Sequence, residues 1–238
     1  MQLKDIERDR YQRQMMLPGI GKEGQLKLKK AKVLIVGVGG LGSPVAAYLC
    51  AAGVGVLGLV DDDVVAESNL QRQILYNSKV VGKLKVHHAQ EVLQTLNPEV
   101  EIDVFEERIS AQNAEAIFQK FDVIVDATDN FRSRYLISQF CQQFNKPMVH
   151  GSIEEFSGMV SVFNYMGGPV YEDLFPEPPQ NTPIDGEPKG VFGALPGIIG
   201  SLQSMEVLKI LAGVGESLSG KLLTYDALAG RFNTLKMI

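Results

Sequence analysis

Lys32-Val-Leu-Ile-Val36 runs directly into Gly37-Val-Gly-Gly-Leu-Gly42, and a run of small residues, 43–52, follows. A short apolar run rich in β-branched residues is typical of a strand that is buried on both faces. The glycines have the spacing GxGxxG, which allows a tight turn, a close approach of backbone N–H groups to a phosphate, and close packing of the next helix. The stretch therefore predicts a strand, a phosphate-binding loop and a helix.

An acidic residue in the expected place supports nucleotide binding. Asp61 ends the next predicted strand, 54–60, and lies 19 residues after Gly42, where a carboxylate can meet a ribose hydroxyl. The chain has no GxxxxGK[ST] motif, which excludes a Walker-type ATPase. The glycine loop alone does not decide between NAD and ATP. Of the three histidines, His150 ends a strand and could line a cleft, although a packing role is the commoner one there.

Strands and helices alternate through the first 150 residues. Alternation with helices of this length implies βαβ units and a parallel sheet. After two polar helices (6–16 and 22–30), the predicted strands are 32–36, 54–60, 100–105, 123–126 and 147–150, and the predicted helices are 43–52, 80–96, 111–120 and 131–144.

The pattern changes after His150. Residues 158–165 alternate like an antiparallel strand, and the proline-rich stretch 166–190 predicts a long loop. Long structureless loops in compact domains are usually functional. A helix with Ile198, Leu202, Met205 and Leu208 on its apolar face is expected next, followed by strands 221–225 and 231–237.

We therefore expect an α/β, Rossmann-like fold. Its largely parallel sheet would be extended by C-terminal antiparallel strands and covered by helices on both faces. A single domain, 1–238, would comprise N-terminal helices (1–30), a nucleotide-binding part (31–150), and an antiparallel part (151–238) that contains a crossover loop, 166–190.

Composition limits the classes of function. The 238 residues include 23 Lys and Arg against 28 Asp and Glu, a net charge of −5, which does not fit a duplex nucleic-acid binder. Two distant cysteines, Cys50 and Cys141, exclude a disulfide framework and a four-cysteine zinc site. Residues 33–60 are 28 uncharged residues, but their seven glycines and one proline indicate turns between short runs. With no apolar leader at the start, we expect a cytoplasmic protein that does not enter membranes.

Several further motifs occur in one order along the chain, and together with the glycine loop they resemble one family. The chain is similar to the ThiF/MoeB/HesA adenylyltransferases, the bacterial branch of the ubiquitin-activating enzyme superfamily, over almost its whole length. The motifs are Arg10-Tyr-Gln-Arg-Gln14, Ser68-Asn-Leu-Gln-Arg-Gln73, Gly82-Lys-Leu-Lys85, Asp126-Ala-Thr-Asp-Asn130, Leu174-Phe-Pro-Glu-Pro-Pro179 and Gly200-Ser-Leu-Gln-Ser-Met-Glu206.

The resemblance implies an activity and its partners. Members of this family are homodimers that use ATP and Mg²⁺ to adenylate the C-terminal glycine of a ubiquitin-like sulfur carrier of the ThiS or MoaD type. We therefore expect ATP and Mg²⁺ as cofactors, a carrier ending in Gly-Gly and a second copy of the chain as partners, and a sulfur-donor enzyme acting afterwards. The sequence leaves open whether the pathway makes thiamine, molybdopterin or another sulfur compound.

The resemblance also assigns roles to individual residues. Arg72 and Lys85 would meet negative charge that builds on the α-phosphate, and Arg13 would act from the partner subunit. Asp129 would hold Mg²⁺, which suits one carboxylate together with phosphate oxygens. The nucleotide would be contacted by Gly37, Gly39, Gly40, Gly42, Asp61, Asp63, Asn69, Gln73, Asn130 and Arg134.

The chain departs from the family pattern in its cysteines. Most relatives carry two CxxC pairs for a structural zinc, but Val170-Tyr-Glu-Asp173 stands where the first would fall, and the sequence ends at Ile238 before the second. We therefore predict no zinc site. Residues 181–189 of the crossover loop also lack the cysteine that bonds the carrier in many relatives. We expect the chain to retain adenylation. We do not expect it to transfer sulfur or form a thioester through a cysteine of this loop.

Three alternative functions remain open at this stage. The substrate could be another carboxylate, such as a peptide, a tRNA-linked group or a small molecule. The chain could be a non-catalytic, carrier-binding subunit, although Arg13, Arg72, Lys85 and Asp129 are all retained. An NAD-dependent dehydrogenase would fit the glycine loop but would leave the later motifs unexplained.

Overall fold

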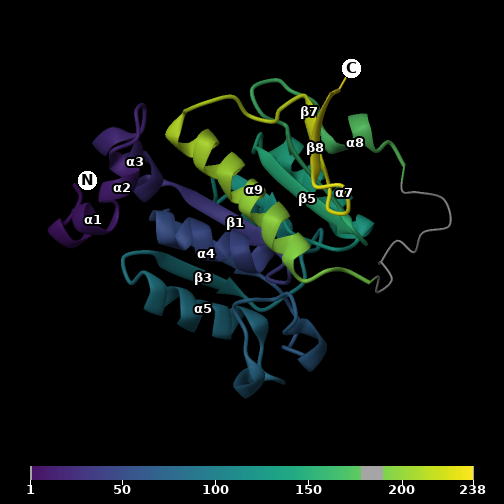
Figure 1. Cartoon of the computed structure of the whole chain (residues 1–238), viewed down its shortest axis with the longest axis horizontal. Coiled ribbons are helices and arrows are strands. Elements are labelled where there is room, and N and C mark those ends of the chain that lie inside the picture. Colours follow the sequence, from purple (N-terminus) through teal and green to yellow (C-terminus); the bar gives the residue numbers. More distant parts are fainter. Residues whose placement is uncertain (1, 178–189, 238) are drawn as a thin grey trace.

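One sheet runs through the whole described chain, which comprises residues 2–177 and 190–237 of a computed structural model (Figure 1). Its strands are β1 (Lys32–Val36), β2 (Val56–Val60), β3 (Glu101–Phe105), β4 (Val123–Asp126), β5 (Met148–Glu154), β6 (Ser157–Phe163), β7 (Lys221–Asp226) and β8 (Arg231–Lys236). Their order is β3-β2-β1-β4-β5-β6-β7-β8. The first five are parallel, and β6, β7 and β8 are antiparallel. The predicted fold class is confirmed.

Helices cover both faces of this sheet. One face packs against α4 (Gly42–Ala52), α5 (Lys85–Leu96) and α9 (Ala194–Ala212), and the other packs against α6 (Ala114–Phe118), α7 (Phe131–Gln143) and α8 (Tyr171–Leu174). The N-terminal helices, α1 (Asp5–Arg10), α2 (Gln12–Met15) and α3 (Gly21–Lys30), lie beside α4 and α9 in Figure 1. Short 3-10 turns occur at Glu67–Asn69 and Ser78–Val80.

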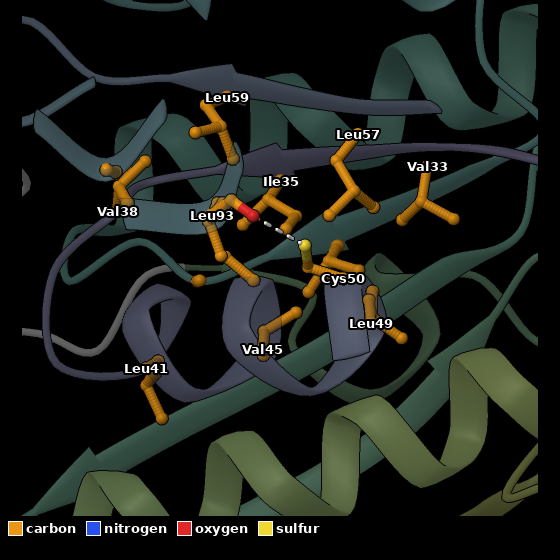
Figure 2. Close-up of a cluster of buried hydrophobic side chains, with 14 of the residues drawn as sticks. Val33, Ile35, Val38, Leu41, Val45, Leu49, Cys50, Leu57, Leu59 and Leu93 are labelled. Atoms are coloured by element: carbon orange, nitrogen blue, oxygen red, sulfur yellow. Dashed lines mark hydrogen bonds between the residues drawn. The ribbon is translucent and has the colours of Figure 1, made fainter. Parts of the chain in front are cut away.

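The central strands are buried on both sides, as their unbroken apolar sequence predicts. In β1, Val33 and Ile35 point into the core under α4, while Leu34 and Val36 point into the core under α6 and α7. Figure 2 shows Val45, Leu49 and Cys50 of α4 facing this sheet. The small side chains of α4 let the helix lie close to the strands.

One predicted helix begins later than its sequence pattern indicates. We expected residues 80–96 to be helical, but α5 begins at Lys85. Residues 81–84 form a turn that ends in a β-bridge between Leu84 and Val64, and Val65 holds it by accepting a backbone hydrogen bond from Gly82 and donating one to Lys83. This difference places Lys85 in the first turn of α5. Helix 111–120 is also shorter, because α6 covers only Ala114–Phe118.

The predicted apolar face of α9 is only partly confirmed, since Leu202 and Leu208 pack half-buried against the core but Met205 does not. Met205 is 55% exposed, whereas Ile199, Gln203 and Val207 are buried. The buried amide nitrogen of Gln203 finds partners, since Nε2 donates to Asp126 O at 2.8 Å and Val149 O at 3.2 Å. Among the described residues, α9 is the one helix that is long and apolar enough to cross a bilayer. Its packing against α4, β5 and β6 makes it a core helix.

The segment predicted as a long loop contains one turn of helix, α8. Residues 178–189 of this segment, including the positions that lack a cysteine, lie outside the described residues. We keep the division of one domain into three parts as a proposal, and the continuous sheet supports it.

Candidate active site

The chain reverses its winding direction between β1 and β4. It leaves β1 toward α4 on one face and leaves β4 toward α7 on the other, although the two strands are neighbours. Ligands of open α/β sheets bind at such a point, outside the carboxyl ends of the strands. Two loops meet there: the glycine loop, 37–42, and the loop 127–130.

The glycine loop requires glycine at two positions for steric reasons. Gly37 has φ +90°, and a Cβ placed on it would lie 2.7 Å from Ala127 O, so the loop after β4 packs directly against it. A Cβ on Gly42 would collide with the carbonyl oxygen of Gly37. Gly39 and Gly40 lie between them and approach side chains of the segment 69–73 and of α9. The predicted strand, turn and helix are confirmed.

Two side chains hold Val38 of the glycine loop. Asp61 Oδ2 accepts a hydrogen bond of 2.8 Å from Val38 N–H, and its Oδ1 accepts one of 2.9 Å from Asp63 N–H. Tyr76 donates its hydroxyl proton to Val38 O at 2.8 Å. Burial raises the pKa of the Asp61 carboxyl above its ordinary value, against the lowering effect of Lys85 and the two N–H groups. The sequence predicted a ribose contact for Asp61, which stays a prediction, and gave no sign of Tyr76, which no motif contains.

Lys85 is a buried cation at the edge of this loop cluster. Its side chain is 6% exposed and its ammonium group lies 2.7 Å from Asp63 Oδ2, whose side chain is 60% exposed. A second contact, from Lys85 N–H to Asp63 O at 3.0 Å, holds the start of α5 against the end of β2. A lysine buried this deeply is rare unless it is paired, and here the pairing partner is turned toward solvent.

The segment 69–73 lies against the glycine loop. Asn69 Oδ1 accepts from Ala66 N–H at 3.0 Å, which closes the turn that positions the segment. The aliphatic part of Arg72 lies 3.5 Å from the Cβ position of Gly40, and the amide of Gln73 lies 3.5 Å from that of Gly39. Gln73 is buried, and its Oε1 has no hydrogen-bond partner within the described residues. An orphaned acceptor beside a phosphate-binding loop fits a site that a ligand completes.

The residues after β4 divide into a cap, an exposed acid and a cation. Asn130 Oδ1 accepts from Ser133 N–H at 2.9 Å, so Asn130 caps α7. Asp129, which is exposed, is not needed as the cap. Arg134 donates from Nη2 to Thr128 O at 3.3 Å and lies over the Phe131 ring, while its buried Nε lacks a partner in the part of the chain described.

The oxygen ligands present fit Mg²⁺ bound together with a nucleotide. Asp61, Asp62 and Asp63 offer carboxylate oxygens within 4.8 Å of one another at the end of β2. Asp129 offers another at the end of β4, across the glycine loop. Mg²⁺ prefers oxygen ligands and usually takes one or two carboxylates with phosphates and water. Asp129 is the stronger candidate because Asp61 and Asp63 already bind Val38 and Lys85.

The fold does not bring Arg13 to this cluster. Arg13 is exposed on α2, and its neighbour Gln14 donates to Ala52 O at 3.1 Å, at the C-terminal end of α4. The glycine loop lies at the N-terminal end of α4, and a helix of 11 residues is about 16 Å long. The other predicted site residues come together at the ends of β1, β2 and β4, and Arg13 does not.

Comparisons with known proteins find relatives along almost the whole chain. A family model described as the ThiF family matches residues 11–238. The chain is 47% identical over 235 residues to the "Sulfur carrier protein adenylyltransferase" of Thermus thermophilus, covering 96% of this chain and 87% of that protein. It is 42% identical over 236 residues to the "Probable molybdopterin-synthase adenylyltransferase" of Gracilaria tenuistipitata, covering 99% of this chain and 66% of that protein.

Other relatives are longer, and a solved structure shares the fold. The chain spans 50–54% of the length of several proteins named "Adenylyltransferase and sulfurtransferase MOCS3". The crystal structure of PaaA superposes with a TM-score of 0.84 at 24% identity, covering 99% of this chain and 75% of that chain. This likeness supports the fold and says nothing about the substrate.

Proposed function

Since this chain belongs to the ThiF family, we propose that it is the adenylyltransferase of a ubiquitin-like sulfur-carrier protein. The observation that carries the proposal is the cluster of Lys85, the segment 69–73 and Asp129 around the glycine loop at the reversal point of the sheet. The names of the Thermus thermophilus and Gracilaria tenuistipitata relatives support a sulfur carrier as the substrate and adenylation as the reaction.

In this reaction a carboxylate oxygen of the carrier's last glycine attacks the α-phosphorus of ATP. The bond from that oxygen to phosphorus forms, the bond to the bridging oxygen breaks, and pyrophosphate leaves with the electron pair. Negative charge grows on the phosphoryl oxygens and on the leaving group. Lys85 and Arg72 would meet that charge, since positioned cations stabilise such transition states. When bound, Mg²⁺ would neutralise phosphate charge, and Asp129 would hold it.

ATP–pyrophosphate exchange tests this function. We expect exchange when the enzyme is mixed with a carrier ending in Gly-Gly, and none with the same carrier lacking its last glycine. Exchange supported by a peptide or a small carboxylate instead would establish the alternative substrate class. Carrier binding without any exchange would establish a non-catalytic subunit. A companion experiment with ThiS-type and MoaD-type carriers would decide between thiamine and molybdopterin pathways.

The sulfur atom would come from a separate donor. Cys50 is buried in α4, where its thiol donates to Leu93 O at 3.3 Å (Figure 2), and burial raises its pKa to about 11. Cys141 is also buried, and burial raises its pKa well above the ordinary value. Reactive cysteines need exposure and a lowered pKa. Neither thiol is therefore suited to hold the carrier.

A homodimer would explain the position of Arg13. The surface near α2 exposes Met16, Leu17, Tyr48 and Met205, each more than half exposed. A groove of about 310 Å³ runs between Tyr48 and Met205 and includes Gln14. Large exposed apolar groups gathered around a groove are typical of a protein interface. If a second copy bound at this groove, Arg13 of each subunit would project from α2 toward the active site of the other subunit.

Mixing two inactive variants tests this arrangement. Arg13→Ala and Asp129→Ala should each be inactive, whereas an equal mixture should recover exchange, because each mixed dimer has one complete site. With random exchange of subunits, about a quarter of all sites would be complete in a two-fold dimer. A mixture of Asp129→Ala with Lys85→Met is the matched control and should stay inactive, because both residues act in the same subunit. No recovery in the first mixture, with subunit exchange demonstrated, would contradict a role for Arg13 across the dimer.

A further inference from the structure

A carboxylate and an imidazole form a polar pair inside the apolar core. Asp126 is the last residue of β4, and His150 is its register partner on β5. Their side chains are 0% and 1% exposed, and Asp126 Oδ2 lies 2.7 Å from His150 Nδ1. The rings of Tyr171, Phe163 and Phe175 surround the imidazole at centroid distances of 5.2, 6.0 and 6.4 Å. Apolar replacements of buried charged groups are often neutral or stabilising, so stability alone does not explain the pair.

The second carboxylate oxygen of Asp126 holds the turn that follows the strand. Oδ1 accepts hydrogen bonds from Thr128 N–H at 3.1 Å and from the Thr128 hydroxyl at 2.6 Å. Thr128 is buried, and the next residue, Asp129, is exposed. Thr128 O in turn accepts from Arg134 Nη2 at 3.3 Å. One buried carboxylate thus fixes the turn that carries Asp129 and that accepts the hydrogen bond of Arg134.

This turn is also the one that touches the glycine loop. The Cβ position of Gly37 lies 2.7 Å from Ala127 O, and Ala127 N–H donates to Val36 O at 3.0 Å. From the other side of the sheet, Gln203 Nε2 of α9 donates to Asp126 O and Val149 O. The ends of β4 and β5 and the phosphate-binding loop are therefore fixed to one another around Asp126.

The charge state of the pair suits a fixed hydrogen-bonding role. Burial by itself would raise the pKa of Asp126, but the hydrogen bond and charge of His150, the Arg134 charge and the Thr128 hydrogen bond hold that pKa below its ordinary value. Burial lowers the pKa of His150. At neutral pH the group is then a carboxylate with a neutral imidazole that donates from Nδ1. A carboxylate with three donors is well satisfied and holds its geometry firmly.

We propose that Asp126, His150 and Thr128 are positioning residues that place Asp129 and Arg134 against the nucleotide's phosphates. None of the three reaches the reacting atoms; they act through the turn 127–129. The inference rests on the proposed function, because it assigns a purpose to the placement of Asp129. A small displacement of a group that orients the reaction can lower the rate by about 10²-fold.

A pair of substitutions at Thr128 tests the proposal. Thr128→Val keeps the shape of the side chain but removes the hydroxyl donor, whereas Thr128→Ser keeps the donor. We expect Thr128→Val to lower kcat for pyrophosphate exchange by about 10-fold or more, and Thr128→Ser to stay near the wild-type value. The second readout is Mn²⁺ binding in the presence of a non-hydrolysable ATP analogue, measured by electron paramagnetic resonance. Thr128→Val should weaken it and Thr128→Ser should not.

Two substitutions at His150 test the proposal independently. Asparagine can place an N–H donor where Nδ1 stands, so His150→Asn should retain the Mn²⁺ affinity. His150→Leu removes a donor from the Asp126 carboxylate and should lose that affinity. If His150→Leu does not fold, the Thr128 pair remains decisive.

The proposal is overturned if folded Thr128→Val keeps both the wild-type kcat and the Mn²⁺ affinity, or if Thr128→Ser loses as much as Thr128→Val. A different result concerns the function. If the wild type shows no carrier-dependent exchange but Thr128→Val still weakens nucleotide-dependent Mn²⁺ binding, the positioning role holds and the proposed substrate is wrong.

Discussion

Asp129→Ala should lower the rate of carrier-dependent pyrophosphate exchange by about 10³-fold or more while the melting temperature stays nearly unchanged. A bound divalent cation supplies several kcal/mol of charge stabilisation, and about 1.4 kcal/mol corresponds to tenfold in rate. The melting temperature should not respond to this substitution, because Asp129 is exposed and its hydrogen bond from Asn130 Nδ2 is long, at 3.4 Å. Exchange kinetics and a thermal melt of the same preparation measure both effects.

Asp122→Asn is the matched control for this prediction. Asp122 precedes the same strand, β4, at its amino end, where its carboxylate accepts from Lys32 N–H at 2.9 Å. An asparagine side chain can still accept this hydrogen bond. The position lies at the amino ends of the parallel strands, and the site lies at their carboxyl ends. We expect wild-type exchange from this variant. An active Asp129→Ala enzyme would remove Asp129 from the site and assign any cation to the carboxylates of 61–63.

The fold could be predicted because its decisive signals are local. The β-branched run at 32–36, the glycine spacing and the stop at Ala52 each depend on neighbours in sequence, and the structure places β1 and α4 within one residue of the expected bounds. Asn130 likewise caps α7, a role that can be predicted from its place directly before the helix. Such features need no knowledge of distant contacts.

The polar interior could not be predicted in the same way. Gln203 and Glu206 look like solvent-facing residues of α9, but Gln203 bonds to the ends of β4 and β5, and Glu206 accepts from Leu218 N–H at 2.8 Å. Because those partners lie outside α9, the periodicity of the helix did not reveal that this polar side is also buried. His150 is a related case, since its role depends on Asp126, 24 residues away. Tertiary hydrogen bonds reverse the rule that polar positions face water.

Lys85 shows what a motif and a structure each contribute. By composition alone Lys85 would be a surface charge, and the resemblance to a family indicated a role in catalysis. The structure adds that the ammonium group is buried and points to Asp63. Lys85 is also the first residue of α5, a later start than the periodicity of residues 80–96 predicted. Arg13 is the opposite case, because the role proposed for it would need a second copy of the chain.

Lys85→Met should lower kcat for exchange by about 10²-fold or more, the usual loss when one charge-stabilising contact is removed. Methionine has a similar length and fills the same space without the charge, so the packing around the start of α5 should survive. The carboxylate left behind, Asp63, is 60% exposed and stays solvated. Asp61 loses the nearby charge of Lys85 but keeps its two N–H donors, so the free energy of unfolding should fall only modestly.

The division of the effect between kinetic constants identifies the role of Lys85. A cation that acts mainly in the transition state lowers kcat and kcat/KM together, whereas one that only binds ATP raises KM with kcat unchanged. We expect the first result. Lys83→Met is the matched control, because Lys83 lies two residues earlier on the same segment, is exposed, and contacts Val65 through its backbone alone. It should behave as the wild type. If both variants lose the same activity, the positive charge of the whole segment, and not Lys85 itself, attracts the nucleotide. If Lys85→Met stays fully active, the ion pair of Lys85 with Asp63 has a structural role only.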